Sequence, residues 1–321
     1  MYLPGDPATS PVRADRRLPT DVPFTAAQAD SQGVGRRVLG RLTRQGLLRR
    51  MVRGVYIDAC VPDSLPVRAK ALSLVVPDSA IVTDRTAAWL HGVDLLAPGD
   101  HLLLPPVAIF QQPGHTRVRT ACSSGGERTL SAHDIIEVAG IPVTTPLRTA
   151  LDLGRLLRRD HAIGALDALL RLGEFTHPML LSEIERFKGF RGVVQLRALA
   201  PLADARAESP AESVLRLRWL DAGLPAPDVQ IAIIDRYGRE LYRVDLGVKQ
   251  RRYAAEYDGV EFHSSPEQRH HDQLRRSWMR SEQGWVVDVF TRRDVYGPNQ
   301  QVGPMLARGL ARARERWPLS A

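Results

Sequence analysis

The stretch "RYAAEYDGVEFHSSPEQRHHDQLRRSWMRSEQGW", residues 252–285, sets the architecture of the last third of the chain. "YAAEYD" reads as a strand, and "PEQRHHDQLRRSWMRSEQ" reads as a helix capped by Ser265 and closed by Gly284. The helix "AESVLRLRWLDAG" and the strands "DVQIAII" and "LYRVDLGV" precede this stretch, whereas the strand "WVVDVFT" and a basic helix follow it. The order helix, three strands, helix, strand, helix predicts an α/β domain.

Acidic side chains on these predicted strands indicate a cation site. Alternation places Glu256 and Asp258 on one face of their strand. Antiparallel pairing would bring Asp245, eleven residues before Glu256, next to it, and Glu212 on the opening helix could approach the same point. Such carboxylates repel one another unless a cation lies among them, and Mg²⁺ (or Mn²⁺) suits oxygen ligands. We expect Asp245 and Glu256 to be the metal ligands.

Histidines near these acids have two interpretations. A neutral imidazole at His263 or His270 could accept a proton from an attacking water. Alternatively, "YDG" is an ordinary turn and the helix is plainly amphipathic, with His271, Leu274 and Trp278 as its buried stripe. We favour the structural interpretation for His271. For Asp245 with Glu256 we favour function, because paired acids on apolar strands are costly without a purpose.

The segment from residue 22 to residue 60 predicts a DNA-binding winged helix. Thr25 is a plausible cap for the helix "AAQADSQ", a second helix spans about 35–45, and "LLRRMVRGVYI" reads as two short strands. The second helix carries arginines on one face and apolar residues on another, which is the layout of a recognition helix. From Ser31 to Ile57 there are seven Arg and no acid, although a basic run can also be only a solvated face. The predicted DNA contacts are Arg36, Arg37, Arg41, Arg44, Arg49, Arg50 and Arg53.

Residues 61–204 predict a mixed α/β middle domain without a catalytic cluster. Strand candidates lie at 80–83, 101–104, 117–120 and 135–144, and the helix "PLRTALDLGRLL" follows Thr145. The histidines of this region are scattered. With a flexible tail over 1–21 and an α/β domain over 205–321, the chain is expected to be a multi-domain α+β protein.

Bulk composition fits a soluble globular protein, and a basic balance alone is weak evidence for nucleic-acid binding, so the placement of the charges matters more. The net charge is +8, and Lys occurs only three times, so Arg supplies nearly all of the positive charge. No apolar run approaches membrane length, and the N-terminus has no signal core. The two cysteines, Cys60 and Cys122, read as reduced thiols of a cytoplasmic protein.

Three motifs resemble a known family of antitoxins. "FTAAQADSQGVGRRVLGRLTRQGLLRRMVRGVYI", "DRTAAWLHGV" and "IPVTTPLRTALDL" are similar to the winged helix and the following region of abortive-infection (type IV) antitoxins. The similarity covers roughly residues 22–200 through short motifs. It implies double-stranded DNA binding, often with repression of the protein's own promoter. A cognate toxin protein stays open as a partner, because the resemblance does not by itself show that one exists.

The last third resembles the restriction-endonuclease superfamily, PD-(D/E)XK, and its very-short-patch-repair-endonuclease-like subgroup. The resemblance rests on Glu212, Asp245, "EYDG" (256–259), His263, Arg275 with Arg276, and "GWVV" (284–287). It implies an α/β/α core, with the two arginines gripping phosphates. Asp258 stands where the superfamily has its catalytic Lys, so either a histidine replaces that Lys or cleavage has been lost.

Two functions therefore remain open from the sequence. The first is a DNA-binding protein with an Mg²⁺-dependent endonuclease-like domain that nicks or hydrolyses DNA. The alternative is a non-catalytic, antitoxin-like transcriptional repressor of a toxin–antitoxin or phage-defence system. Neither interpretation calls for a membrane or an organic cofactor. RNA binding is weaker because no aromatic stacking platform is evident.

Overall fold

The computed structural model describes residues 18–19, 21–95, 104–114, 122–235, 237–259, 266–297 and 301–318. Contacts group the chain into two units, Met1–Asp152 and Leu153–Ala321. The content is mixed α/β with three sheets in the described ranges, so the predicted α+β class is confirmed. The boundaries predicted after residues 60 and 204 each fall inside a unit. No helix within the described ranges is both long and apolar enough to span a bilayer.

The first unit begins with a small sheet that carries two helices. Its strands are β1 (Phe24–Thr25), β2 (Leu48–Val52) and β3 (Val55–Asp58), in the antiparallel order β1-β3-β2. The helices are α2 (Ala26–Ser31) and α3 (Arg36–Arg44). Thr25 and Gln28 form a capping box that starts α2, as the Thr25 cap predicted. Helices followed by a hairpin in this strand order form a winged helix.

A five-stranded mixed sheet follows in the same unit, in the order β6-β5-β4-β8-β7. Its strands are β4 (Ile81–Val82), β5 (Val107–Gln111), β6 (Ser123–Glu127), β7 (Ile135–Val138) and β8 (Ile141–Thr144). The β7–β8 turn has positive φ at Ala139 and Gly140, where the sequence predicted it. The sequence did not predict β5 and β6. The expected strand at 117–120 and residues 101–103 of another lie outside the described residues.

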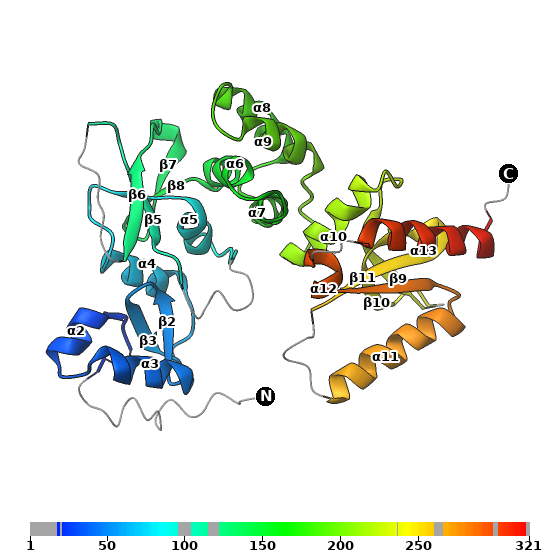
Figure 1. Cartoon of the computed structure of the whole chain (residues 1–321), viewed down its shortest axis with the longest axis horizontal. Coiled ribbons are helices and arrows are strands. Elements are labelled where there is room, and N and C mark those ends of the chain that lie inside the picture. Colours follow the sequence, from blue (N-terminus) through cyan, green and yellow to red (C-terminus); the bar gives the residue numbers. More distant parts are fainter. Residues whose placement is uncertain are drawn as a thin grey trace. The chain divides into compact units, whose positions relative to one another are not determined.

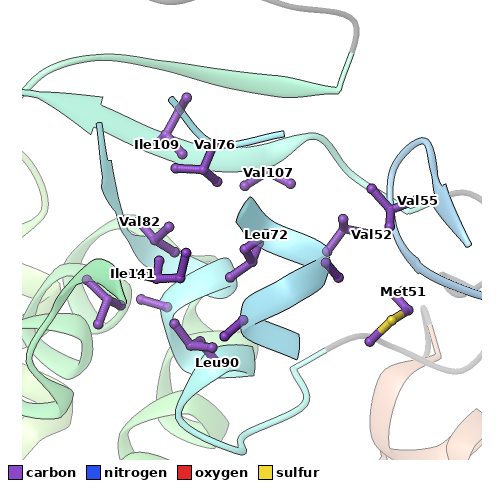
Figure 2. Close-up of a cluster of buried hydrophobic side chains, with 14 of the residues drawn as sticks. Met51, Val52, Val55, Leu72, Val76, Val82, Leu90, Val107, Ile109 and Ile141 are labelled. Atoms are coloured by element: carbon purple, nitrogen blue, oxygen red, sulfur yellow. The ribbon is translucent and has the colours of Figure 1, made fainter. Parts of the chain in front are cut away.

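One apolar core joins the winged hairpin to this sheet. Leu72 of α4 (Leu65–Ser73) packs among Val52 and Val55 of the hairpin and Val107 and Ile109 of β5 (Figure 2). Side chains of β4, β8 and α5 (Asp84–Leu90) complete the cluster. The wing is therefore braced by residues far along the chain, which fixes its position relative to the sheet.

Helices lead from there into the second unit. They are α6 (Pro146–Leu156), α7 (Arg159–Arg171), α8 (His177–Glu183), a 3₁₀ turn (Ile184–Phe187), α9 (Val193–Leu199), a second turn (Ala200–Leu202) and α10 (Pro210–Asp221). Helices α7 and α10 pack together, and the guanidinium of Arg216 donates to the Asp167 carboxylate at 2.7 Å in a buried ion pair. Desolvation raises the pKa of Asp167 despite this partner.

The C-terminal sheet has the order β12-β11-β10-β9. Its elements are β9 (Asp228–Ile234), β10 (Glu240–Val248), a 3₁₀ turn (Lys249–Arg251), β11 (Tyr253–Asp258), α11 (Pro266–Ser281), β12 (Val286–Thr291), α12 (Arg292–Tyr296) and α13 (Val302–Arg316). Helix α11 lies on one side of the sheet, and α10 and α13 lie on the other (Figure 1). The predicted order is confirmed, with the short α12 as an unpredicted addition.

Asp288 is a charged residue within the apolar strand β12, and neighbouring side chains donate hydrogen bonds to both of its carboxylate oxygens. The Tyr253 hydroxyl donates to its Oδ2 at 3.0 Å, and Arg312 of α13 donates to its Oδ1 at 2.7 Å. Gly309 leaves the space for this contact, because a Cβ there would lie 2.0 Å from Asp288 Oδ2. Asp288 is therefore a structural link between β12 and α13.

Candidate nucleic-acid interface and acidic cluster

Helix α3 has the two-sided character of a recognition helix. Arg36, Arg37, Arg41 and Arg44 are all exposed. On the other side, Leu39 is fully buried in the N-terminal core, where Val38 and Leu42 also pack. The apolar stripe holds the helix to the sheet, so the arginine stripe faces solvent at a fixed orientation. This is the placement that the residue spacing predicted.

The three arginines of the hairpin differ from one another. Arg53 is exposed at the β2–β3 turn, where Gly54 adopts a φ of 82°. Arg49 donates to the Val61 carbonyl at 3.0 Å, and the Arg50 guanidinium lies 5.5 Å from the centre of the Tyr56 ring. Both are half-buried, so Arg53 is the hairpin cation best placed to reach a ligand.

A groove of about 840 Å³ adjoins the arginine stripe. Arg36 of α3 and Arg53 of the wing line it, together with the first turn of α2. Its remaining wall comes from Leu74–Pro77 and Cys122 of the same unit. Sequence reasoning missed this groove, because no local signal connects Cys122 with the wing. The thiol lies so close that a Cβ on Gly54 would be 2.5 Å from its Sγ.

In the second unit, Asp245 and Glu256 lie on adjacent strands. The register pairs Leu246 with Ala255, which places Asp245 next to Glu256. Asp245 Oδ2 accepts the Tyr257 backbone N–H at 2.8 Å. Burial raises the pKa of Asp245 to about 7, and the nearby charges of Glu212 and Glu256 add to the increase. The predicted proximity of Asp245 and Glu256 is therefore present. The charge of Glu212 acts on Asp245, but the three acids do not form a common metal-holding group within the described residues.

Glu256 is the most buried acid of this group, with 3% of its surface exposed. Its Oε2 accepts from Arg275 Nη2 at 3.2 Å and from Arg276 Nε at 2.9 Å. Arg276 Nη2 also donates to Asp258 Oδ2 at 3.0 Å. Glu256 Oε1 is buried and has no hydrogen-bond partner in the described part of the chain. The two arginines predicted to grip phosphates thus contact the acids of their own domain.

Glu212 is held in place by two hydrogen bonds. Its Oε2 accepts from the Glu208 backbone N–H and from Gln230 Nε2, both at 2.9 Å. Gln230 has a φ of 55°, a strained value for a non-glycine residue. Sequence reasoning did not identify Gln230, since no motif marks a strand glutamine as a partner of a helix acid.

The oxygen atoms of Asp245 and Glu256 meet in part what a divalent cation needs as ligands. Glu256 Oε1 is buried without a hydrogen-bond partner in the described ranges, and Asp245 lies beside Glu256 on the neighbouring strand, so a cation would find carboxylate oxygens here. Mg²⁺ is often held by only one or two carboxylates with waters. However, the described residues include no group of three or more His, Cys, Asp or Glu side chains arranged to hold a metal. Asp245 and Glu256 would be the protein ligands of such an ion.

The histidine predictions have mixed outcomes. His263 lies outside the described residues, and His270 is exposed on α11. The expected buried stripe of α11 is wrong in part, because His271 is exposed and Leu274 is 56% exposed. Met279 is buried and Trp278 packs beside it in the core beneath α11. In the orientation that α11 adopts, Arg275 and Arg276 contact the acids of β11, whereas His271 and Leu274 are exposed.

Comparison with known proteins identifies the family. Residues 80–202 match the AbiEi antitoxin C-terminal domain. Two relatives, the uncharacterized proteins MT2308 and Rv2248 of Mycobacterium tuberculosis strains CDC 1551 / Oshkosh and H37Rv, are each 35% identical to this chain over 276 residues. Each alignment covers 84% of this chain and 95% of the relative. The chain therefore belongs to the same family as these mycobacterial proteins, and its residues 80–202 are similar to the AbiEi antitoxin C-terminal domain.

Proposed function

We propose that this protein is a DNA-binding, antitoxin-like transcriptional regulator. The observation that carries the proposal is the exposed arginine stripe of α3 on a winged-helix unit whose wing also presents Arg53. The antitoxin domain at residues 80–202 supports the same function and favours a toxin protein as partner. Helix α3 would enter the major groove, while Arg53 contacts a backbone phosphate.

DNA binding is tested with duplex DNA from the region preceding the protein's own coding sequence. Fluorescence anisotropy over a range of salt concentrations compares the wild type with the double variant Arg37→Ala/Arg41→Ala. Losing two phosphate-contacting cations should weaken binding and reduce the slope of log K against log salt by about 2. The matched control is Arg308→Ala/Arg316→Ala, which removes two exposed arginines from α13. Equal losses in both variants would mean that general charge, not α3, binds the DNA.

A second candidate function is metal-dependent nicking of DNA by the C-terminal domain. The observation that favours it is the buried Glu256 Oε1 beside Asp245, an oxygen with no hydrogen-bond partner among the described residues. Asp245 and Glu256 would hold Mg²⁺, and the ion would supply charge stabilisation at a phosphate. Glu212 would support Asp245, with His263 as the base.

The nicking test uses supercoiled plasmid with Mg²⁺ or Mn²⁺. Nicking by the wild type that disappears in Asp245→Ala supports the candidate. The same background in both proteins rejects it and leaves the regulator.

A further inference from the structure

The acids of β11 are held by cations that belong to the protein itself. Glu256 and Asp258 are bridged by Arg276, and Arg275 adds a second contact to Glu256. Both arginines come from consecutive positions of α11, so one turn of this helix supplies the positive charge. Removing one of these arginines would leave an uncompensated charge on a buried acid.

These contacts satisfy only one side of Glu256. Both guanidinium groups donate to Oε2, whereas Oε1 is buried without a partner in the described ranges. Asp245 lies on the neighbouring strand at this point, and its Oδ2 accepts the Tyr257 backbone N–H. A second cation therefore has acceptor oxygens available, but it would lie close to two guanidinium groups of like charge.

We propose that a divalent cation at Asp245 and Glu256 competes with Arg276 for Glu256, so that cation binding loosens the hold of α11. Like charges in a partly buried site repel strongly, so each weakens the binding of the other. A guanidinium that leaves the acids is then available for a phosphate. The inference rests on the cation site of the second candidate function, but it does not require cleavage.

The test is Mn²⁺ binding to the full-length protein, measured by titration calorimetry and by the thermal shift that Mn²⁺ produces. Arg276→Gln removes the competing charge and is expected to bind Mn²⁺ about tenfold more tightly than the wild type. The matched control is Arg280→Gln on the same helix, because Arg280 donates to the Val287 carbonyl and not to a carboxylate. We expect this control to bind like the wild type.

Two further variants distinguish an effect of charge on Mn²⁺ binding from a folding defect. Arg276→Lys keeps the positive charge and should bind Mn²⁺ close to the wild-type value. Where Arg276→Gln is unfolded by circular dichroism, Arg275→Gln replaces it, with a smaller increase in affinity expected from the longer contact. Equal or weaker binding in a folded glutamine variant overturns the proposal, as does the absence of Mn²⁺ binding in all folded variants. Mn²⁺ binding that Arg276→Gln leaves unchanged overturns this proposal alone, whereas no Mn²⁺ binding in any folded variant also rules out the cation site of the nicking candidate. Promoter binding is a separate readout of the regulator.

Discussion

The substitution Asp245→Asn should stabilise the second unit in a pH-dependent manner. The pKa of Asp245 is raised from its ordinary value of 3.8 to about 7, mainly by burial. Between these two values the folded protein keeps a proton that the unfolded chain releases, so the group destabilises the fold progressively as pH rises through this window. Below about pH 4 both states are protonated and the penalty vanishes.

The size of the effect follows from the two pKa values. A rise from 3.8 to about 7 corresponds to an upper limit of about 4 kcal/mol above neutral pH. Asp245 keeps partial contact with solvent, so we expect roughly half of this, about 2 kcal/mol, at pH 8. Asparagine removes the titration and still provides an oxygen for the Tyr257 N–H.

Urea unfolding followed by tryptophan fluorescence measures the effect. Trp219, Trp278, Trp285 and Trp317 all lie in the second unit, so the signal reports mainly on that unit. The gain in the free energy of unfolding for Asp245→Asn should be about 2 kcal/mol at pH 8 and close to zero near pH 4.

Asp235→Asn is the control, because its effect on the free energy of unfolding should have the opposite sign. Backbone hydrogen bonds from Arg239 and Tyr237 lower the pKa of Asp235, so this variant should lose stability above pH 4 and recover it in acid. A gain for Asp245→Asn that does not change with pH would refute the assignment of a raised pKa to Asp245.

Three further predictions concern stability. Gly309→Ala should destabilise the second unit by about 2 kcal/mol or more, because its Cβ would lie 2.0 Å from Asp288 Oδ2 and 2.5 Å from the Tyr253 hydroxyl. Gly303→Ala is the mild control, because its Cβ would lie 3.3 Å from Ala222 Cβ. Equal unfolding midpoints for the two variants would contradict the packing argument. Asp167→Ala leaves Arg216 buried without its partner and should cost about 3 kcal/mol in urea unfolding, whereas a neutral result would show that α7 and α10 are not coupled through this pair. Thr25→Ala removes the capping box of α2 and should cost about 1 kcal/mol; Thr25→Ser, which keeps the hydroxyl, should recover most of the loss in thermal unfolding.

The sequence by itself determined the elements of both ends of the chain. Regular spacing of arginines and apolar residues predicted α3, and alternation bounded by turn residues predicted β9, β10 and β11. The acids Asp245 and Glu256 were also correctly expected to be neighbours, because a short connection between two antiparallel strands nearly fixes their register. In each case local chain geometry sufficed.

Only the tertiary structure decided which partner each side chain has. Arg275 and Arg276 have the spacing of any exposed basic helix, and their contact with Glu256 depends on how α11 is rotated over the sheet. The exposure of Leu274 and His271 follows from the same rotation. Likewise, the shared core of the wing and the five-stranded sheet joins residues far apart in the chain (Figure 2). Periodicity specifies the faces of an element, whereas long-range packing selects what each face meets.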